Sequence, residues 1–241
     1  MKALIMAAGK GSRISKNING VPKCTLPLPD GTPIIRKSIQ MMLELGIEPI
    51  LCIGYEGEKV RQALDGLAVK YYENPFFAVT NNVASVWFAL QELDGHDDVL
   101  LLSGDLYYPK SFLEKALESS GALSMLVDSS RIYDGDFYFH VDKDGFVERY
   151  GKQLPLPMRH CEYMGFTKVS ASMVPVFAQR IQDYVKQGDY QTYFEDVALS
   201  FSKKKEEKIV LIDVKGSFWR EFDYYEDYEL ILEHERNGRN E

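Results

Sequence analysis

The chain has 241 residues, enough for one large α/β domain or two small ones and for a buried core. Hydrophobic residues make up 45% and charged residues 27% of it, which is typical of a globular protein and excludes a disordered chain. The formal net charge of −8 argues against a general nucleic-acid surface, because binding a phosphate backbone needs a positive patch.

Neither a membrane segment nor a disulfide framework is visible in the sequence. No apolar run approaches the roughly 20 residues that a membrane helix needs, and the apolar start, residues 1–6, is too short for a secretory signal. The three cysteines, Cys24, Cys52 and Cys161, are odd in number and widely spaced, which indicates neither disulfides nor a zinc cluster. We therefore expect a cytoplasmic protein.

The first half of the sequence alternates two kinds of segment. Short apolar runs flanked by Gly and Asp are typical of buried strands, and the longer amphipathic stretches between them are typical of helices. The predicted strands are 3–7, 49–53 and 99–102, and the predicted helices are 33–45, 57–64, 82–93 and 111–118. This alternation predicts βαβ units and hence an α/β, Rossmann-like, doubly wound sheet with mostly parallel strands.

The pattern changes near residue 125. Two short runs, 137–141 and 146–150, flank a Lys-Asp-Gly turn and predict a β-hairpin. The remaining predictions are strands at 161–169 and 208–214 and helices at 171–187, 193–204 and 224–235. With no repeat and no linker composition, we expect a single domain (1–241). Its first half, 1–125, is α/β, and its second half, 126–241, adds a β-rich insertion to a mixed sheet.

A turn of small residues follows the first predicted strand. It reads Ala7-Ala8-Gly9-Lys10-Gly11-Ser12-Arg13, and ligands of doubly wound sheets bind at such carboxyl ends of strands. Small residues let backbone N–H groups approach phosphate oxygens, and the guanidinium of Arg13 adds a fork of donors. The run lacks the spacing of a P-loop and the third glycine of a dinucleotide fingerprint. A structural tight turn is the alternative.

Two aspartates follow predicted strands. The run 99–102 continues through Ser103 and Gly104 to Asp105, and the alternating segment 218–223 ends in Asp223 before the C-terminal helix. Mg²⁺ prefers oxygen ligands, typically one or two carboxylates with phosphate and water. Because 118 residues separate the two aspartates, a shared Mg²⁺ site is a prediction about the tertiary fold. The alternative role for Asp223 is a helix N-cap.

A Pro22-Lys23 pair follows the glycine turn. The turn, the pair and the two aspartates together resemble the nucleotidyltransferase family that includes sugar-1-phosphate nucleotidylyltransferases and phosphocholine cytidylyltransferases. The resemblance implies that the turn holds a triphosphate, that Lys23 neutralises it and that the aspartates bind Mg²⁺. The implied residues are Arg13 and Lys23 (catalytic), Asp105 and Asp223 (metal), and Ala7, Ala8, Gly9, Gly11, Ser12, Asn82, Ser85 and Gly104 (nucleotide).

Base recognition is assigned to the start of the predicted helix at 82–93. Asn82 and Ser85 are three residues apart and share a face, and an asparagine amide both donates and accepts hydrogen bonds, as the edge of cytosine requires. The alternative role for asparagine here is a helix cap. The Asn-Asn-x-x-Ser segment resembles the phosphocholine cytidylyltransferase branch rather than the sugar-nucleotide branch, which implies CTP.

Two further segments, 165–168 and 219–223, also resemble 2-aminoethylphosphonate cytidylyltransferases, which implies that Lys168 contacts the acceptor's phosphonate. An acceptor ammonium needs carboxylates, and Asp134, Asp136, Glu195 and Asp196 are near the predicted site loops. Quaternary ammonium is held by aromatic faces, which Tyr133, Tyr138, Tyr163 and Tyr193 could supply. Packing is the commoner role of aromatic residues, so composition alone assigns no such cage. The predicted acceptor-binding residues are Lys168, Asp136, Tyr193 and Glu195.

The sequence thus predicts a cytidylyltransferase that moves CMP from CTP to the phosphate or phosphonate of a small, amine-bearing acceptor and releases pyrophosphate. The acceptor oxygen is already anionic, so positioning and charge neutralisation carry the rate. The alternatives are a sugar-1-phosphate nucleotidylyltransferase, a phosphoglutamine-type cytidylyltransferase and a nucleotide-binding regulatory subunit. The sequence leaves the acceptor and the oligomeric state, a homodimer included, open.

Overall fold

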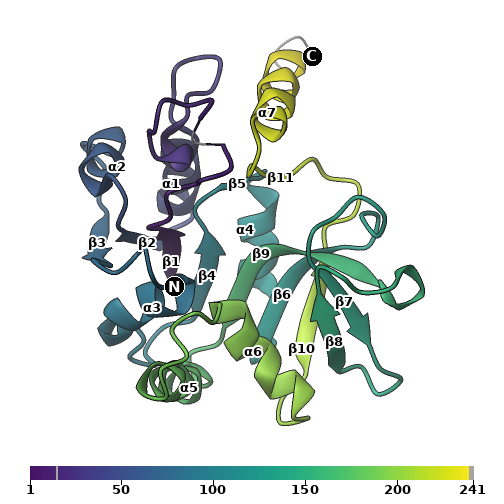
Figure 1. The fold of residues 1–241 in the computed structure, drawn as a ribbon. Helices are drawn as coiled ribbons and strands as arrows, with labels where there is room; N and C mark the ends of the chain where they lie inside the picture. The colour runs from purple at the N-terminus through teal and green to yellow at the C-terminus, as the bar shows by residue number, and fades with distance from the viewer. Residues whose placement is uncertain (15, 239–241) are drawn as a thin grey trace.

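The computed structural model describes residues 1–14 and 16–238. Its main element is a nine-stranded sheet with the order β10-β6-β9-β4-β1-β2-β3, from which the β7–β8 hairpin branches (Figure 1). The strands are β1 (Lys2–Ala7), β2 (Glu48–Ile53), β3 (Lys70–Glu73), β4 (Val99–Ser103), β5 (Leu106–Tyr107), β6 (Leu123–Asp128), β7 (Tyr138–Val141), β8 (Val147–Gly151), β9 (Cys161–Val169), β10 (Ile209–Asp213) and β11 (Arg220–Glu221). The helices are α1 (Ile34–Glu44), α2 (Gly57–Ala63), α3 (Asn82–Phe88), α4 (Ser111–Glu118), α5 (Val174–Lys186), α6 (Phe194–Lys203) and α7 (Tyr225–Asn237).

The sheet is mixed and mostly parallel. β1 pairs in parallel with β2 and β4, β2 with β3, and β6 with β10. β9 runs antiparallel to both β4 and β6, and β7 pairs with the start of β9. The prediction of a Rossmann-like, doubly wound α/β fold with a β-rich insertion is therefore confirmed.

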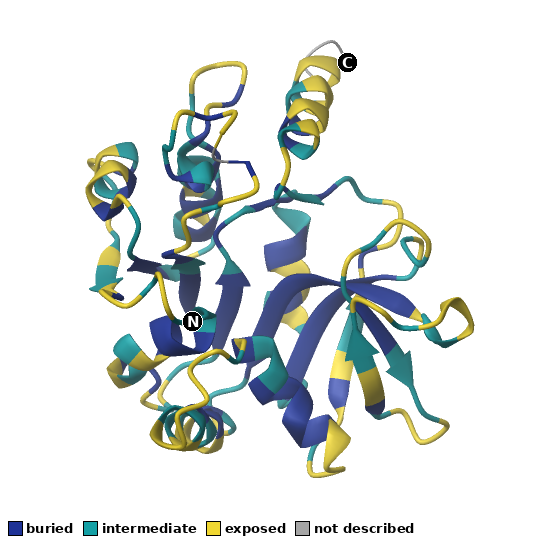
Figure 2. Cartoon of the chain, viewed as in Figure 1, coloured by how far each residue is buried: buried dark blue, intermediate teal, exposed yellow. Residues whose placement is uncertain are grey.

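Helices cover both faces of the sheet because its central strands are apolar on both sides. Successive side chains of β1 point to opposite faces: Leu4 packs with residues of α3, α5 and α6, whereas Ala3 and Ile5 pack with residues of α1, α2 and α4. Figure 2 shows this as dark blue strands between helices whose outer sides are yellow. The two-sided core fixes the carboxyl ends of β1 and β4 side by side.

The first crossover helix follows the signals in its sequence. α1 begins after Pro33, which is the residue before the first helical turn, and proline's fixed φ suits that position. It ends at Glu44, and Gly46 follows with φ +69°, the left-handed conformation that closes many helices. The predicted range 33–45 therefore differs from the observed helix only at its ends.

A third, smaller cluster lies outside the two main layers. It joins Ile14 and Ile18, from the segment after the glycine turn, to Phe222 beside β11 and to Tyr228 and Ile231 of α7. Helix α7 extends away from the sheet (Figure 1), and this cluster is its apolar attachment. The segment after the glycine turn and the C-terminal helix are thereby packed together.

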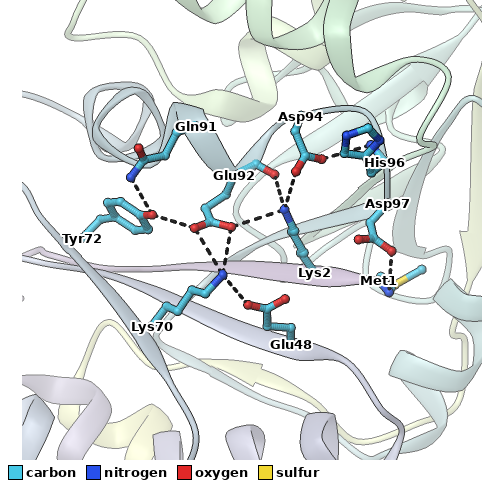
Figure 3. A network of polar contacts seen from close by, with 10 residues as sticks. All are labelled: Met1, Lys2, Glu48, Lys70, Tyr72, Gln91, Glu92, Asp94, His96 and Asp97. Carbon is cyan, nitrogen blue, oxygen red and sulfur yellow. Dashed lines mark hydrogen bonds and ion pairs between the residues drawn. The ribbon is translucent and has the colours of Figure 1, made fainter.

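A polar network holds the amino end of β1, on the edge of the sheet opposite the glycine turn (Figure 3). The Lys2 ammonium lies 3.3 Å from a Glu92 carboxylate oxygen and 2.9 Å from one of Asp94. Tyr72 donates a hydrogen bond of 2.6 Å to Glu92. Burial alone would lower the pKa of Lys2, but the two carboxylates outweigh it and raise the pKa. These contacts stabilise the first strand of the sheet far from the candidate site.

Three short or fully buried strands were not predicted, namely β3, β5 and β6. The predicted helix at 82–93 ends early, because α3 stops at Phe88 and a 3₁₀ turn, Leu90–Glu92, follows. Cys24, Cys52 and Cys161 are free and buried. Among the described residues, none of the helices combines the length and the apolar character that crossing a membrane requires.

Candidate active site

Two adjoining cavities of about 310 Å³ each open at the carboxyl ends of β1 and β4. Five residues, Gly11, Ser103, Tyr193, Glu195 and Glu221, line both. The first cavity is also lined by Ala7, Ala8, Gly9, Lys23, Asn82, Ser85, Gly104 and Asp105, and the second by Ser12, Arg13, Asp136, Lys152 and Asp223. Of the residues predicted from the sequence, Lys168 is the one outside this pair of cavities.

Two glycines of the site have a structural reason, one in its backbone conformation and one in a close approach to a neighbouring strand. Gly11 has φ +61°, and a Cβ there would lie 3.2 Å from Cδ of Lys23. Gly104 lies against β1, where a Cβ would come within 2.8 Å of the carbonyl oxygen of Met6. Real Cβ atoms do not fit at the 2.8 Å of Gly104, so this glycine lets the end of β4 lie against β1. Gly11 is favoured by its positive φ, and its missing side chain leaves room for Lys23 beside the turn.

Lys23 joins the two distant aspartates. Its ammonium forms an ion pair with Asp105 and another, 2.6 Å long, with Asp223. Arg13 pairs with the second carboxylate oxygen of Asp223. The backbone explains the meeting, because β5 and β11 pair antiparallel and the N–H of Phe222 donates to the carbonyl of Asp105 over 3.1 Å.

The charges in this cluster shift one another's pKa values. Burial alone would lower the pKa of Lys23, but its two carboxylate partners raise it above its usual value. Burial alone would raise the pKa of Asp223, but Lys23 and Arg13 outweigh it and lower the pKa. At neutral pH, Lys23 is therefore charged and Asp223 ionised.

Glu221 is a third acid of the cluster and was not predicted from the sequence. Burial, with the charges of Asp105 and Asp223, raises its pKa well above the usual value. One ligand atom each from Asp105, Glu221 and Asp223 all lie within 4.8 Å of one another. The two-residue spacing of Glu221 and Asp223 in an extended segment, which puts both on one side, is the signal that could have revealed it.

These three carboxylates fit a hard divalent cation. Oxygen ligands from one or more carboxylates, with phosphate and water, are what Mg²⁺ prefers. The Oδ1 atom of Asp105 is buried without a hydrogen-bond partner, which a buried carboxylate oxygen rarely is unless it binds something further. The donor set is therefore able to hold Mg²⁺ beside the glycine turn.

The alternative of an N-cap for Asp223 is wrong. Helix α7 has Tyr224 as its N-cap, and the Tyr224 N–H donates to Asp227 over 3.1 Å. Asp223 lies one residue before the cap and directs its carboxylate to Lys23 and Arg13. Its side chain therefore belongs to the charge cluster.

Asn82 and Ser85 both line the first cavity, as their shared face predicts. Asn82 is not a cap, because Asn81 precedes the helix. The amide of Asn82 donates to Glu195 over 3.3 Å and accepts the N–H of Phe194 over 2.7 Å. The start of α3 is thereby tied to the start of α6, so that one unit borders both cavities.

The second cavity combines both signs of charge with aromatic rings. Asp136 and Lys152 form an ion pair at its wall, and burial raises the pKa of Glu195 to about 7. Tyr193 is half exposed there. Tyr163 also lines this cavity, whereas Asp134, Asp196, Tyr133 and Tyr138 are not among its lining residues. Lys152 was not predicted from the sequence. It lies two residues after the predicted hairpin, and no recognisable motif surrounds it.

The prediction for Lys168 is corrected by the structure. Its ammonium donates to the carbonyl of Ser119 over 2.5 Å and lies 3.0 Å from the carboxylate of Asp98, which directly precedes β4. β9 runs antiparallel to β4, and Lys168 pairs with Leu100 near the amino end of that strand. The lysine is therefore buried near the amino end of β4, whereas the two cavities lie at the carboxyl end of that strand.

Lys168→Met is expected to lower stability without changing catalysis. The variant leaves the carbonyl of Ser119 without its donor and Asp98 without its cation, which should cost about 1–3 kcal/mol of the free energy of unfolding. Chemical denaturation measures the loss, and turnover per folded molecule should match the wild type. A fall in turnover at constant folded fraction would restore Lys168 to the site.

Comparisons with known proteins agree with the geometry. Residues 3–135 match the family described as MobA-like NTP transferase domain. Two curated relatives are the CMP-5'-(3-aminopropyl)phosphonate synthase of Streptomyces rubellomurinus, 33% identical over 48% of this chain and 19% of that protein, and the CTP:phosphoglutamine cytidylyltransferase of Campylobacter jejuni, 21% identical over 97% of this chain and 100% of that protein. The chain thus matches only about a fifth of the first relative's length.

A solved structure shares the whole fold. The CTP:phosphocholine cytidylyltransferase of Streptococcus pneumoniae superposes with a TM-score of 0.74 at 19% identity, covering 97% of this chain and 98% of that one. At such identity the likeness concerns the fold. It extends beyond the 3–135 segment and includes the β-rich second half.

Proposed function

The chain belongs to the MobA-like NTP transferase domain family and is a nucleotidyltransferase; from this premise we propose that it transfers CMP from CTP to the phosphate or phosphonate of a small, amine-bearing acceptor and releases pyrophosphate. Residues 1–125 supply the nucleotide side and 126–241 most of the acceptor side of one domain. Both curated relatives named above have CMP or CTP in their names, which supports the choice of nucleotide.

The single observation that carries the acceptor class is the mixed charge of the second cavity. Arg13 and Lys152 offer cations to a phosphate or phosphonate, whereas Asp136 and Glu195 offer carboxylates to an ammonium group. A zwitterionic acceptor brings an anion for Lys152 and a cation for Asp136, which now pair with each other. A sugar phosphate brings only the anion and would draw Lys152 away from Asp136 without replacing its cation. Lys152 takes the role that the sequence analysis gave to Lys168.

The proposed mechanism is an in-line displacement without a covalent intermediate. The first cavity receives CTP, with the triphosphate along the glycine turn and the base near Asn82 and Ser85. Arg13 and Lys23 neutralise phosphate charge, and the second cavity aligns the acceptor oxygen with the α-phosphorus. Asp105, Glu221 and Asp223 would hold Mg²⁺, which neutralises and orients the phosphates when bound.

Base selection follows from the amide of Asn82. Its two present contacts, to Glu195 and Phe194, fix the orientation of the side chain and leave one N–H of the amide for a base carbonyl. Ser85 lies on the same face with its hydroxyl accepting from Asn74 over 3.1 Å, which leaves the hydroxyl proton free to be donated. We assign the pyrimidine edge to this pair.

A matrix of nucleotides and acceptors tests the proposal. We expect pyrophosphate release with CTP and Mg²⁺ to exceed that with UTP or dTTP by about 100-fold, because a site built around specific hydrogen bonds rejects the wrong edge strongly. Phosphocholine, 2-aminoethylphosphonate and phosphoglutamine are the test acceptors, and glucose 1-phosphate is the control. Turnover confined to glucose 1-phosphate would identify a sugar nucleotidylyltransferase, and nucleotide binding without any turnover would identify a regulatory protein.

A further inference from the structure

Glu162 is a buried acid that no step of the proposed reaction uses. It lies on β9 with 3% of its surface exposed, opposite Asp128 of β6, which is equally buried. Asp128 is satisfied by neutral donors, the Trp219 indole at 2.9 Å and the backbone N–H of Ser130 at 2.8 Å. Burying two carboxylates side by side costs free energy. The contacts that Glu162 makes must therefore compensate for this cost.

The contacts of Glu162 all reach into the segment between β6 and β7. Its Oε1 accepts the backbone N–H of Asp136 over 2.7 Å. Its Oε2 lies 2.7 Å from Nε of Arg131. The Arg131 guanidinium is itself fixed, with its carbon 4.2 Å from the centre of the Trp219 ring and one nitrogen donating to the Trp219 carbonyl over 3.3 Å.

The segment between β6 and β7 packs tightly against the Glu162 carboxylate. A Cβ on Gly135 would lie 2.5 Å from Cδ of Glu162, far inside contact distance, so that only glycine fits there. The hydroxyl of Tyr138 donates to the carbonyl of Gly135 and holds it from the other side. The next two residues, Asp136 and Phe137, line the second cavity.

We propose that Glu162 is a positioning residue for acceptor binding: its hydrogen bond to the Asp136 N–H sets where Asp136 and Phe137 face the acceptor. This inference rests on the proposed function. Glu162 is not among the residues lining either cavity of the site, so it acts through the segment. Its effect should appear in the affinity for the acceptor and leave the nucleotide side unchanged, because its carboxylate pairs with Asp136 and Arg131, neither of which lines the first cavity.

The test separates a positioning role from a structural one by comparing KM with kcat. Glu162→Ala removes the partner of the Asp136 N–H, and we expect the KM for the acceptor to rise at least about tenfold, with kcat and the KM for CTP within about threefold of the wild type. Glu162→Gln keeps an oxygen for that N–H and should restore the acceptor KM to within about threefold. Asp128→Asn, at the neighbouring buried acid, is the matched control and should leave the acceptor KM unchanged.

Several outcomes would contradict the positioning role or the function on which it rests. An unchanged acceptor KM in Glu162→Ala, or a rise of the same size in Asp128→Asn, would overturn the positioning role. Should Glu162→Ala not fold, Glu162→Asp keeps the charge but shortens the side chain and draws the carboxylate away from the Asp136 N–H; it must raise the acceptor KM, and an unchanged value would again overturn the inference. Wild-type protein that turns over no acceptor in the matrix above would instead overturn the proposed function, and the inference with it.

Discussion

Lys23→Met should lower kcat/KM for CTP by about 10³-fold while the protein remains folded. Lys23 is 13% exposed and lines the first cavity beside the glycine turn, where its charge would meet the triphosphate. Removing one preorganised donor to a developing phosphate charge typically costs 10²–10³ in rate, and removing a full cation costs more. Steady-state pyrophosphate release at saturating acceptor measures the loss.

The matched control for this variant is Lys110→Met. Lys110 is an ion-paired lysine on the surface, 2.8 Å from Glu44, and such pairs contribute little to stability. We expect its kcat/KM to stay within about twofold of the wild type. Near-wild-type turnover in Lys23→Met would remove Lys23 from the catalytic residues and with it the proposed path of the triphosphate.

Lys23 pairs with two of the carboxylates that would hold a divalent cation. The ammonium bridges Asp105 and Asp223, and Arg13 also pairs with Asp223, so that these two cations hold two of the three neighbouring acids together. Asp105, Glu221 and Asp223 would be the ligands of a bound Mg²⁺, and Lys23 would then be available to the phosphates. The pairing with Lys23 thus keeps two of the acids close together, which suits a site proposed to accept a highly charged substrate.

Much of the fold could be predicted because its signals are local. The buried run of β1, the small residues after it, and the Pro33 and Gly46 boundaries of α1 can each be recognised within a few residues. β3 and β5 escaped prediction because they have four and two residues, too few for a period. β6, Leu123–Asp128, has every residue buried, so that it shows no alternation to distinguish it from a loop or helix.

The site was predictable only where a motif accompanies the chemistry. The glycine turn, Pro22-Lys23 and the Gly-Asp strand end are compact patterns, whereas Glu221, Lys152 and Glu162 owe their positions to tertiary contacts. Glu221 reaches Asp105 through the β5–β11 pairing, and no local rule predicts that two-residue ladder. The assignment of Lys168 to the site was wrong for a related reason. Its motif does not reveal which end of β9 it occupies, and that depends on how β9 pairs with β4.

Asp223→Asn is expected to reduce turnover at least about 100-fold and to weaken the dependence on Mg²⁺. The variant keeps the size of the side chain but takes away one of the three carboxylates that surround the proposed cation position. It also removes one of the two anions paired with Lys23 and the partner of Arg13. With fewer anionic ligands, the Mg²⁺ concentration that gives half-maximal activity should rise.

Thermal unfolding supplies a second measurement for the same variant, independent of turnover. A ligand that binds only the folded state raises the unfolding temperature more, the higher its concentration is relative to its Kd, so Mg²⁺ with CTP should stabilise the wild type more than Asp223→Asn. Lys23→Met should respond to Mg²⁺ alone at lower concentration than the wild type, because the competing ammonium is gone. Glu229→Gln, an exposed acid on α7, is the control for loss of charge. Equal Mg²⁺ responses in the wild type and Asp223→Asn would place the cation elsewhere and leave Asp223 as a partner of Lys23 and Arg13 alone.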